Sequence, residues 1–404
     1  MKVMILVFLA MNFANASIPT YDAPEILARA SIRDGYNLPA MSFITDSSPV
    51  INNHGDMAFK IIAAVDGEVS QGLWVKTAEE SQGKIVYIAP NDRLITDPSL
   101  SDSGKIVFSL FDDGVTDGLF LYDLKTEIAE QVLNPENMPI QDYTYPQVLN
   151  NNNIFFRATD DSNNRIYYEF NGQKLNKILA ESDENLGIKS SYLFRLNVNE
   201  KGQLAFKSRM GEKGQLDENN PDSIILLSPA KEGEEIVMKV TTIAMDQDSN
   251  SQSNFIRFGN SVSLSNNSMT TFIGYLPGNI KAIVLSKDNV LTNIAVEGQN
   301  GITEIELFTP KVNDQGLVLF RAKDKEGKRG IYIADGSSLS RIIGEGDEVQ
   351  TDLGAGKILY NPKYPGFGGE VGLNNLGEII FNAVVFSTDD KELGSAIYKI
   401  SPKK

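Results

Sequence analysis

One short pattern, Asn-x-x-Gly-x-x-x-Phe, returns seven times along the chain and constrains its fold more than any other feature. The copies begin at residues 52, 101, 149, 199, 265, 313 and 374. The glycine position holds Gly55, Gly104, Asn152, Gly202, Ser268, Gly316 and Gly377, and the last position holds Phe59, Phe108, Phe156, Phe206, Phe272, Phe320 and Phe381. Glycine and asparagine tolerate positive φ, and alternating apolar residues follow, so each copy predicts a tight turn and then a strand whose phenylalanine lies in the core.

Two more apolar segments follow each copy, as in GLFLY at 118 and AEQVL at 129. Together with a strand before the turn they make four strands per unit, which is the content of a propeller blade. The units are spaced about 50 residues apart, and two longer spacings contain insertions at 210–222 and 344–370. We therefore predict an all-β, seven-bladed propeller that forms one domain over residues 17–404.

The two ends of the chain predict how the ring closes. The seventh unit stops after SAIYKI at 395 and lacks the third segment of the other six. Residues 24–39 resemble that missing segment. We expect residues 26–30 to form the outermost strand of the last blade, which would close the ring without capping repeats.

The amino terminus predicts export. A basic start, an apolar run over 3–11 and the small residues of Ala14-Asn15-Ala16 fit a signal peptide that ends at residue 16. No apolar run is long enough to span a bilayer, and the absence of cysteine excludes disulfides, thiolate metal sites and a lipid-modified cysteine. The net charge of −16 repels nucleic acid. We expect a monomer, without a transmembrane segment, in the periplasm or outside the cell.

The seven copies resemble a family of bacterial secreted tandem-repeat proteins that share an NxxGxxxF-containing repeat. The resemblance covers nearly the whole chain after residue 16. It implies a propeller and a cell-surface or extracellular location, and it implies no catalytic residues because the shared motif is structural. Many members carry a carboxy-terminal anchor, whereas this sequence ends at Lys404 without one, so release is expected rather than attachment.

Patterns for catalysis and cofactors are nearly absent. His54 is the only histidine and lies within a turn motif, so it cannot build a catalytic triad or a multi-histidine metal site. The segment 246–252 places Asp246, Asp248 and Asn250 as in a calcium loop, but Ser251 and Arg257 stand where glycine and glutamate are required. No cofactor is predicted, and calcium is left as a minor alternative.

The face opposite the motif turns, which we call the loop face, carries the candidate ligand contacts. It receives the loops that follow the motif strands, the loops between blades and both insertions. The candidates are Asp112, Asp113, Asp160, Asp161, Asp183, Asp347, Asp389, Asp390, Tyr145, Tyr364 and Phe367. Our first hypothesis is a non-enzymatic binding or scaffold protein that recognises a protein, peptide or glycan through this face. The alternative is a carbohydrate-active hydrolase or lyase that uses paired carboxylates there.

Overall fold

The computed structural model describes residues 17–403, except residues 45, 66–67, 91–92, 113–114, 136–139, 182, 184–185, 188, 213–219 and 234. The predicted signal peptide and Asp113 therefore lie outside the described residues. Within the described part of the chain, no helix is long and apolar enough to cross a membrane.

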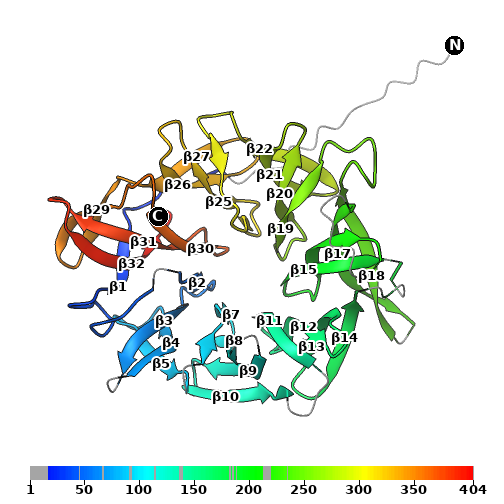
Figure 1. The fold of residues 1–404 in the computed structure, drawn as a ribbon, viewed down its shortest axis with the longest axis horizontal. Coiled ribbons are helices and arrows are strands. Elements are labelled where there is room, and N and C mark those ends of the chain that lie inside the picture. The colour runs from blue at the N-terminus through cyan, green and yellow to red at the C-terminus, as the bar shows by residue number, and fades with distance from the viewer. Residues whose placement is uncertain are drawn as a thin grey trace.

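Seven antiparallel sheets stand around a central channel, as predicted (Figure 1). Blade 1 comprises β2 (Val50–Ile51), β3 (Met57–Val65), β4 (Glu68–Lys76) and β5 (Lys84–Ile88). Blade 2 comprises β6 (Leu94–Ile95), β7 (Ser99–Leu100), β8 (Lys105–Asp112), β9 (Val115–Asp123) and β10 (Ile128–Leu133). Blade 3 comprises β11 (Ile140–Val148), β12 (Ile154–Asp160), β13 (Arg165–Phe170) and β14 (Leu175–Ala180), and blade 4 comprises β15 (Ser190–Val198), β16 (Leu204–Met210), β17 (Asp222–Glu232) and β18 (Glu235–Met245).

Blade 5 comprises β19 (Arg257–Leu264), β20 (Thr270–Leu276), β21 (Ile280–Lys287) and β22 (Val290–Val296). Blade 6 comprises β23 (Glu304–Ile305), β24 (Lys311–Val312), β25 (Val318–Lys323), β26 (Arg329–Ala334) and β27 (Leu339–Gly344). Blade 7 comprises β30 (Phe367–Leu373), β31 (Ile379–Ser387), β32 (Glu392–Ile400) and β1 (Glu25–Ala30). The insertion before β30 forms a hairpin of β28 (Glu348–Thr351) and β29 (Gly354–Ile358), and β29 joins the same sheet beside β31.

The ring closes as the sequence predicts, because β1 pairs antiparallel with β32 and becomes the outermost strand of blade 7 (Figure 1). Arg29 fastens this strand. Its guanidinium makes two hydrogen bonds to the carboxylate of Asp352, of 2.7 and 2.8 Å, and donates to the carbonyl of Leu393 at 2.8 Å. The side chain is only 1% exposed. The first strand of the chain is thus tied both to the last strand and to the β28–β29 hairpin.

Each motif forms the turn between the two innermost strands of its blade. All seven residues at the glycine position have positive φ, including Asn152 at 69° and Ser268 at 64°. The asparagine that begins four of the motifs accepts a hydrogen bond from the backbone two residues later, as His54 donates to Asn52. The seven motif phenylalanines are 0 to 2% exposed. The predicted turn and the predicted core position are both confirmed.

The second motif position links every blade to the next through side chains. Its residues are Asn53, Asp102, Asn150, Glu200, Asn266, Asp314 and Asn375. The side chain of each accepts a hydrogen bond from the backbone of the preceding motif, at 2.6 to 3.0 Å, and the last link runs from the Asn375 amide to the Asn53 side chain. This polar ring surrounds the channel on the motif face, the face that carries the seven turns, and narrows it to a cavity of about 190 Å³.

The innermost strand of every blade is interrupted before it reaches its motif turn. Its pairing breaks between residues 43 and 50, 95 and 99, 144 and 147, 193 and 196, 258 and 262, 305 and 311, and 368 and 372. A break of this kind bends a strand and redirects its side chains. These interruptions ring the channel on the side of the loop face.

The residue directly after the motif phenylalanine supports the interruption in the next blade. Arg157 donates to the carbonyl of Leu193, Lys207 to that of Phe258 and Arg321 to that of Gly369. Lys60, Ser109 and Asn382 make the corresponding contacts with Asp97, Tyr143 and Ile44. Only blade 5, with Ile273, breaks the pattern. The loop-face end of the channel is therefore built from irregular backbone held in place by polar side chains.

Candidate functional site at the channel mouth

The channel opens on the loop face into a cavity of about 410 Å³, which we call the channel mouth. The interrupted segments of blades 1, 2, 3, 4 and 7 line it. Its charged residues are Lys60, Asp97, Arg195, Lys311 and Glu370. Three cations against two carboxylates give this cavity a positive balance, opposite in sign to the −16 of the whole chain.

Glu370 is the centre of the ionic group in the channel mouth. One carboxylate oxygen accepts hydrogen bonds from Arg195 and from the hydroxyl of Thr309, both at 2.7 Å. The other accepts from Lys311 at 2.6 Å. Burial alone would raise the pKa of Glu370, but Lys311 and Arg195 outweigh burial and hold this pKa at about 2. Blades 4, 6 and 7 therefore meet at one ionised carboxylate.

We expect Glu370→Gln to lower the unfolding free energy by roughly 1–3 kcal/mol at neutral pH, because two cations lose their counter-charge. The folded-state pKa of about 2 lies below the ordinary value of 4.5, so the ionised carboxylate contributes stability above pH 4.5 and loses it as the pH falls toward 2. The difference between wild type and variant should shrink over that range. Urea unfolding followed by Trp74 fluorescence measures it, with the exposed Glu392→Gln as control. A difference that stays constant with pH would refute this account.

Tyr145 stands at the channel mouth in an unusual backbone conformation. Its φ is 56°, a left-handed value that is costly for an aromatic residue, and it lies within the interruption of β11, directly before Pro146. The side chain is 40% exposed. The guanidinium carbons of Arg157 and Arg195 lie 5.1 and 5.3 Å from the centre of its ring. Strained backbone conformations concentrate at functional sites. Here the strained backbone of Tyr145 places an exposed ring beside two cations.

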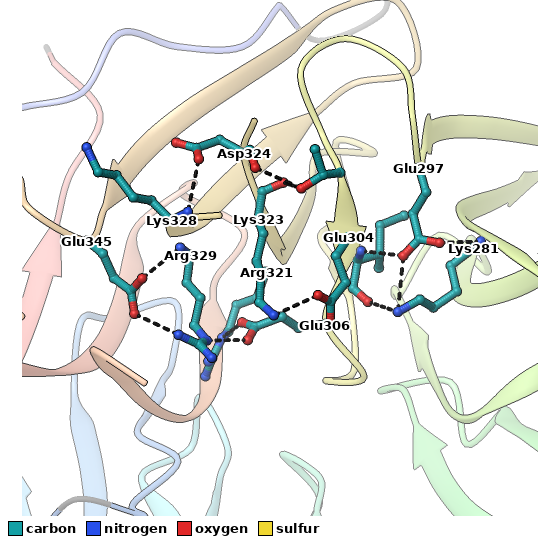
Figure 2. Close-up of polar contacts among 12 residues, drawn as sticks. Lys281, Glu297, Glu304, Glu306, Arg321, Lys323, Asp324, Lys328, Arg329 and Glu345 are labelled. Carbon is teal, nitrogen blue, oxygen red and sulfur yellow. Dashed lines mark hydrogen bonds and ion pairs between the residues drawn. The ribbon is translucent and has the colours of Figure 1, made fainter. Parts of the chain in front are cut away.

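An ionic chain of Glu306, Arg321, Arg329 and Glu345, shown in Figure 2, contacts the segment that carries Glu370. Glu306 accepts hydrogen bonds from Arg321 at 2.8 Å and from Arg329 at 3.0 Å. Arg329 continues to Glu345 at 3.2 Å, and Glu345 accepts the backbone N–H of Gly366 at 2.8 Å. Arg321 also donates to the carbonyl of Gly369 at 2.7 Å. Blade 6 thus fixes both ends of the backbone that leads into Glu370.

Two further cavities adjoin the channel mouth on the loop face. One, of about 540 Å³, lies between blades 6 and 7 and shares Ser48 and Glu370 with the channel mouth. The other, of about 550 Å³, reaches blades 4 and 5 and shares Phe308 with the second cavity. The three cavities are therefore neighbours on the loop face, with shared lining residues between them.

The structure distributes the predicted carboxylates over blades 2, 3 and 7 and the loop after β27. Asp112 ends β8 and pairs with Arg93, Asp183 pairs with Lys177, and Asp347 pairs with Arg341. Asp160 accepts backbone hydrogen bonds within the β12–β13 turn, where Asp161 follows it. In the β31–β32 turn, Asp389 pairs with Lys391, and Asp390 pairs with Lys357 of β29. None of these residues lines the three cavities, and their role as ligand contacts stays a prediction.

The predicted aromatic residues have three different surroundings. Tyr145 lies at the channel mouth, as described above. Phe367 is 2% exposed and packs against Phe381, with its ring centre 5.9 Å from that of Phe381. Tyr364 is exposed in the loop before β30, next to Pro365 of the second cavity. The structure brings only Tyr145 into the ionic group around Glu370.

The minor calcium alternative concerns the acidic side chains in the described part of the chain. No three His, Asp or Glu side chains gather there in an arrangement that could hold an ion. In the segment 246–252, Asp246 accepts hydrogen bonds from the backbone of Asp222 and Ser249. These bonds make Asp246 a turn residue that also ties the start of β17 to the loop after β18.

Sequence reasoning missed Arg195, Lys311 and Glu370, which build the channel mouth. Their positions in chain order show no pattern, because each lies beside an interruption of an inner strand. A weaker signal was present in the residue after the motif phenylalanine, which is polar in six of seven copies where the strand enters the core.

No curated protein matches the chain. Among solved structures, an oligogalacturonate lyase in complex with manganese matches with a TM-score of 0.54 at 10% identity, covering 96% of this chain and 98% of that one. An oligogalacturonate lyase from Vibrio parahaemolyticus matches with a TM-score of 0.55 at 11% identity, covering 96% and 99%. The polysaccharide lyase Uly1 matches with a TM-score of 0.51 at 8% identity, covering 95% and 98%.

At these identities the likeness establishes the propeller fold alone. One family model matches residues 34–387, which is most of the chain and reaches into all seven blades. The chain therefore belongs to DUF7453, a family of unknown function.

Proposed function

We propose that the protein is an exported, non-enzymatic binding or scaffold propeller that holds an extended ligand across its loop face, with the channel mouth as the anchor point. The observation that carries this proposal is the row of three neighbouring cavities, which share the lining residues Glu370, Ser48 and Phe308. Each cavity lies in the size range of small-molecule sites, and together they suit a chain of several units.

Side-chain hydrogen bonds hold the backbone around the channel mouth in place. The interrupted inner strands present side chains to the channel, and polar side chains from the neighbouring blade fix the bent backbone. A site of this kind needs little reordering when a ligand binds, so less of the interaction free energy is spent on ordering. The resemblance to secreted repeat proteins and the expected signal peptide support a place outside the cytoplasm.

The solved structures of similar fold favour a glycan among the candidate ligands. Two of them are named as oligogalacturonate lyases and one as a polysaccharide lyase. Their enzymatic activity supports the alternative that this protein too acts on a carbohydrate. In the ionic group around Glu370 both cations are paired with the one carboxylate. The other carboxylate of the cavity, Asp97, pairs with Lys60. Carboxylates engaged with cations in this way favour binding over acid–base catalysis.

Binding measured on glycan and peptide arrays tests the location of the site. We expect ligands of the wild type to be lost in the double variant Tyr145→Asn/Arg195→Gln, in which asparagine tolerates the positive φ of position 145. They should be kept in His54→Gln, which alters an exposed side chain on the motif face. Ligands that are lost in His54→Gln and kept in the double variant would place the site on the wrong face and overturn the proposal.

A further inference from the structure

We propose that the channel mouth recognises a hexuronate residue of a glycan, with Arg195 and Lys311 receiving the sugar carboxylate and Tyr145 contacting the sugar ring. This inference rests on the proposed function above and names the class of ligand for the same site.

The first argument is the unused donor capacity of Arg195. A guanidinium carries five N–H donors in a planar fork, and only one nitrogen of Arg195 bonds Glu370. No other side-chain hydrogen bond of Arg195 occurs among the described residues, and its side chain is 32% exposed. A carboxylate that enters the channel mouth can therefore take the free edge of the fork without breaking the bond to Glu370.

Lys311 offers a second cation at the other carboxylate oxygen of Glu370. Its ammonium has three donors, and its one side-chain hydrogen bond in the described chain goes to Glu370. Burial lowers the pKa of Lys311, and the charge of Glu370 opposes that shift. A second carboxylate at this place would offset the same desolvation, so the site gains from an anionic ligand beyond its contact with Arg195.

The second argument is the surface that surrounds these cations. Tyr145 presents an exposed ring next to Arg195. Hydroxyl and amide side chains line the same cavity, namely Ser48, Thr96, Thr144, Gln147 and Asn197. Hydroxyl and amide groups match the hydroxyls of a sugar, and an aromatic ring packs against its C–H face. A cationic site for one carboxylate, surrounded by side chains that can bond sugar hydroxyls, fits a uronate better than an acidic peptide. An acidic peptide carries no comparable hydroxyls.

The test compares three polymers that separate charge from sugar. Polygalacturonate carries both, its fully methyl-esterified form keeps the sugar without the charge, and polyglutamate keeps the charge without the sugar. We expect polygalacturonate to bind at least about tenfold more tightly than either of the other two by titration calorimetry, as one charge-assisted pair predicts. The preference over the ester should weaken at high salt.

Variants then assign the contacts. Arg195→Gln should reduce the affinity for polygalacturonate to that for the ester, whereas Tyr145→Asn should weaken binding of both sugars by the same factor. Arg33→Gln, which alters an exposed arginine outside the channel mouth, serves as the matched control and should bind as wild type does. Thermal unfolding of each variant shows whether it is folded.

The possible results separate the two proposals. Equal affinity for polygalacturonate and its ester, abolished by Tyr145→Asn, would overturn the hexuronate inference and keep the site. Tighter binding of polyglutamate would overturn it in favour of an acidic peptide. Binding of none of the three polymers would also overturn the hexuronate inference. The glycan and peptide arrays would then test the proposed function independently. Polygalacturonate binding together with a rise in ultraviolet absorbance, from an unsaturated product, would support the ligand class and overturn the non-enzymatic proposal.

Discussion

Replacing Arg29 with alanine should lower the unfolding free energy by about 3–5 kcal/mol, the cost of removing one partner of a buried ion pair. The guanidinium is 1% exposed and forms a two-point contact with Asp352, whose own side chain is 13% exposed. Without Arg29 this carboxylate stays in the interior without its cation. The carbonyl of Leu393 in β32 loses a hydrogen bond at the same time. The substitution therefore weakens the contact that fastens the first strand to the last.

Urea unfolding measures the loss, and limited proteolysis of the native protein shows whether β1 has detached. Arg29→Lys should lie between wild type and Arg29→Ala, because lysine keeps the charge but lacks the planar fork. Arg33→Ala, four residues along and exposed, should change stability by less than about 0.5 kcal/mol. A loss in Arg29→Ala no larger than in this control would show that β1 pairing alone closes the ring.

Glu306→Gln should have a comparable effect, about 3–5 kcal/mol, since Glu306 is the only carboxylate that contacts both Arg321 and Arg329 among the described residues. Arg321 is 1% exposed and its pKa is already lowered by burial. Glutamine has nearly the same shape but no charge, so the two guanidiniums would share a buried region with Glu345 alone (Figure 2). Ligand binding should weaken as well, because Arg321 holds the backbone before Glu370.

Glu304→Gln provides the matched control two residues away. Glu304 pairs with Lys323 at 2.6 Å, but its side chain is 47% exposed, and exposed pairs contribute only about 0–1 kcal/mol. Urea unfolding of both variants should therefore separate them clearly. A double-mutant cycle with Arg321→Met should show coupling between positions 306 and 321 of at least about 1 kcal/mol. Equal losses in the two glutamine variants would contradict a special role for Glu306.

The parts of the fold that repeat could be predicted from the sequence. The positive φ at Gly55 and its six equivalents follows from residue type and spacing, and so does the buried position of Phe59 and its equivalents. The pairing of β1 with β32 could be predicted because one unit lacked a strand that the amino-terminal segment could supply. The turn and the buried phenylalanine repeat, so each copy supports the others, and the missing strand is recognised by comparison with the six complete units.

The candidate site could not be predicted in the same way. Tyr145, Arg195, Lys311 and Glu370 come from four blades and meet only because the inner strands are interrupted. A register shift depends on contacts with the next blade and leaves no period in the sequence. The predicted loop carboxylates marked turns, and Asp160 illustrates this, since its side chain accepts hydrogen bonds from the backbone of its own turn. Aspartate is frequent in turns for this local reason, whether or not a ligand is nearby.

The pairing of β1 with β32 also sets the order of events during synthesis. The ribosome makes Ala30 long before its partner Ser395. At the usual rate of about 5–20 residues per second, β1 has to wait on the order of a minute before its hydrogen-bonding edge is covered. Until then the edge of β1 that pairs with β32 is without that partner. The ring can therefore close only after β32 has been made, and until then β1 has to be kept from pairing with other chains.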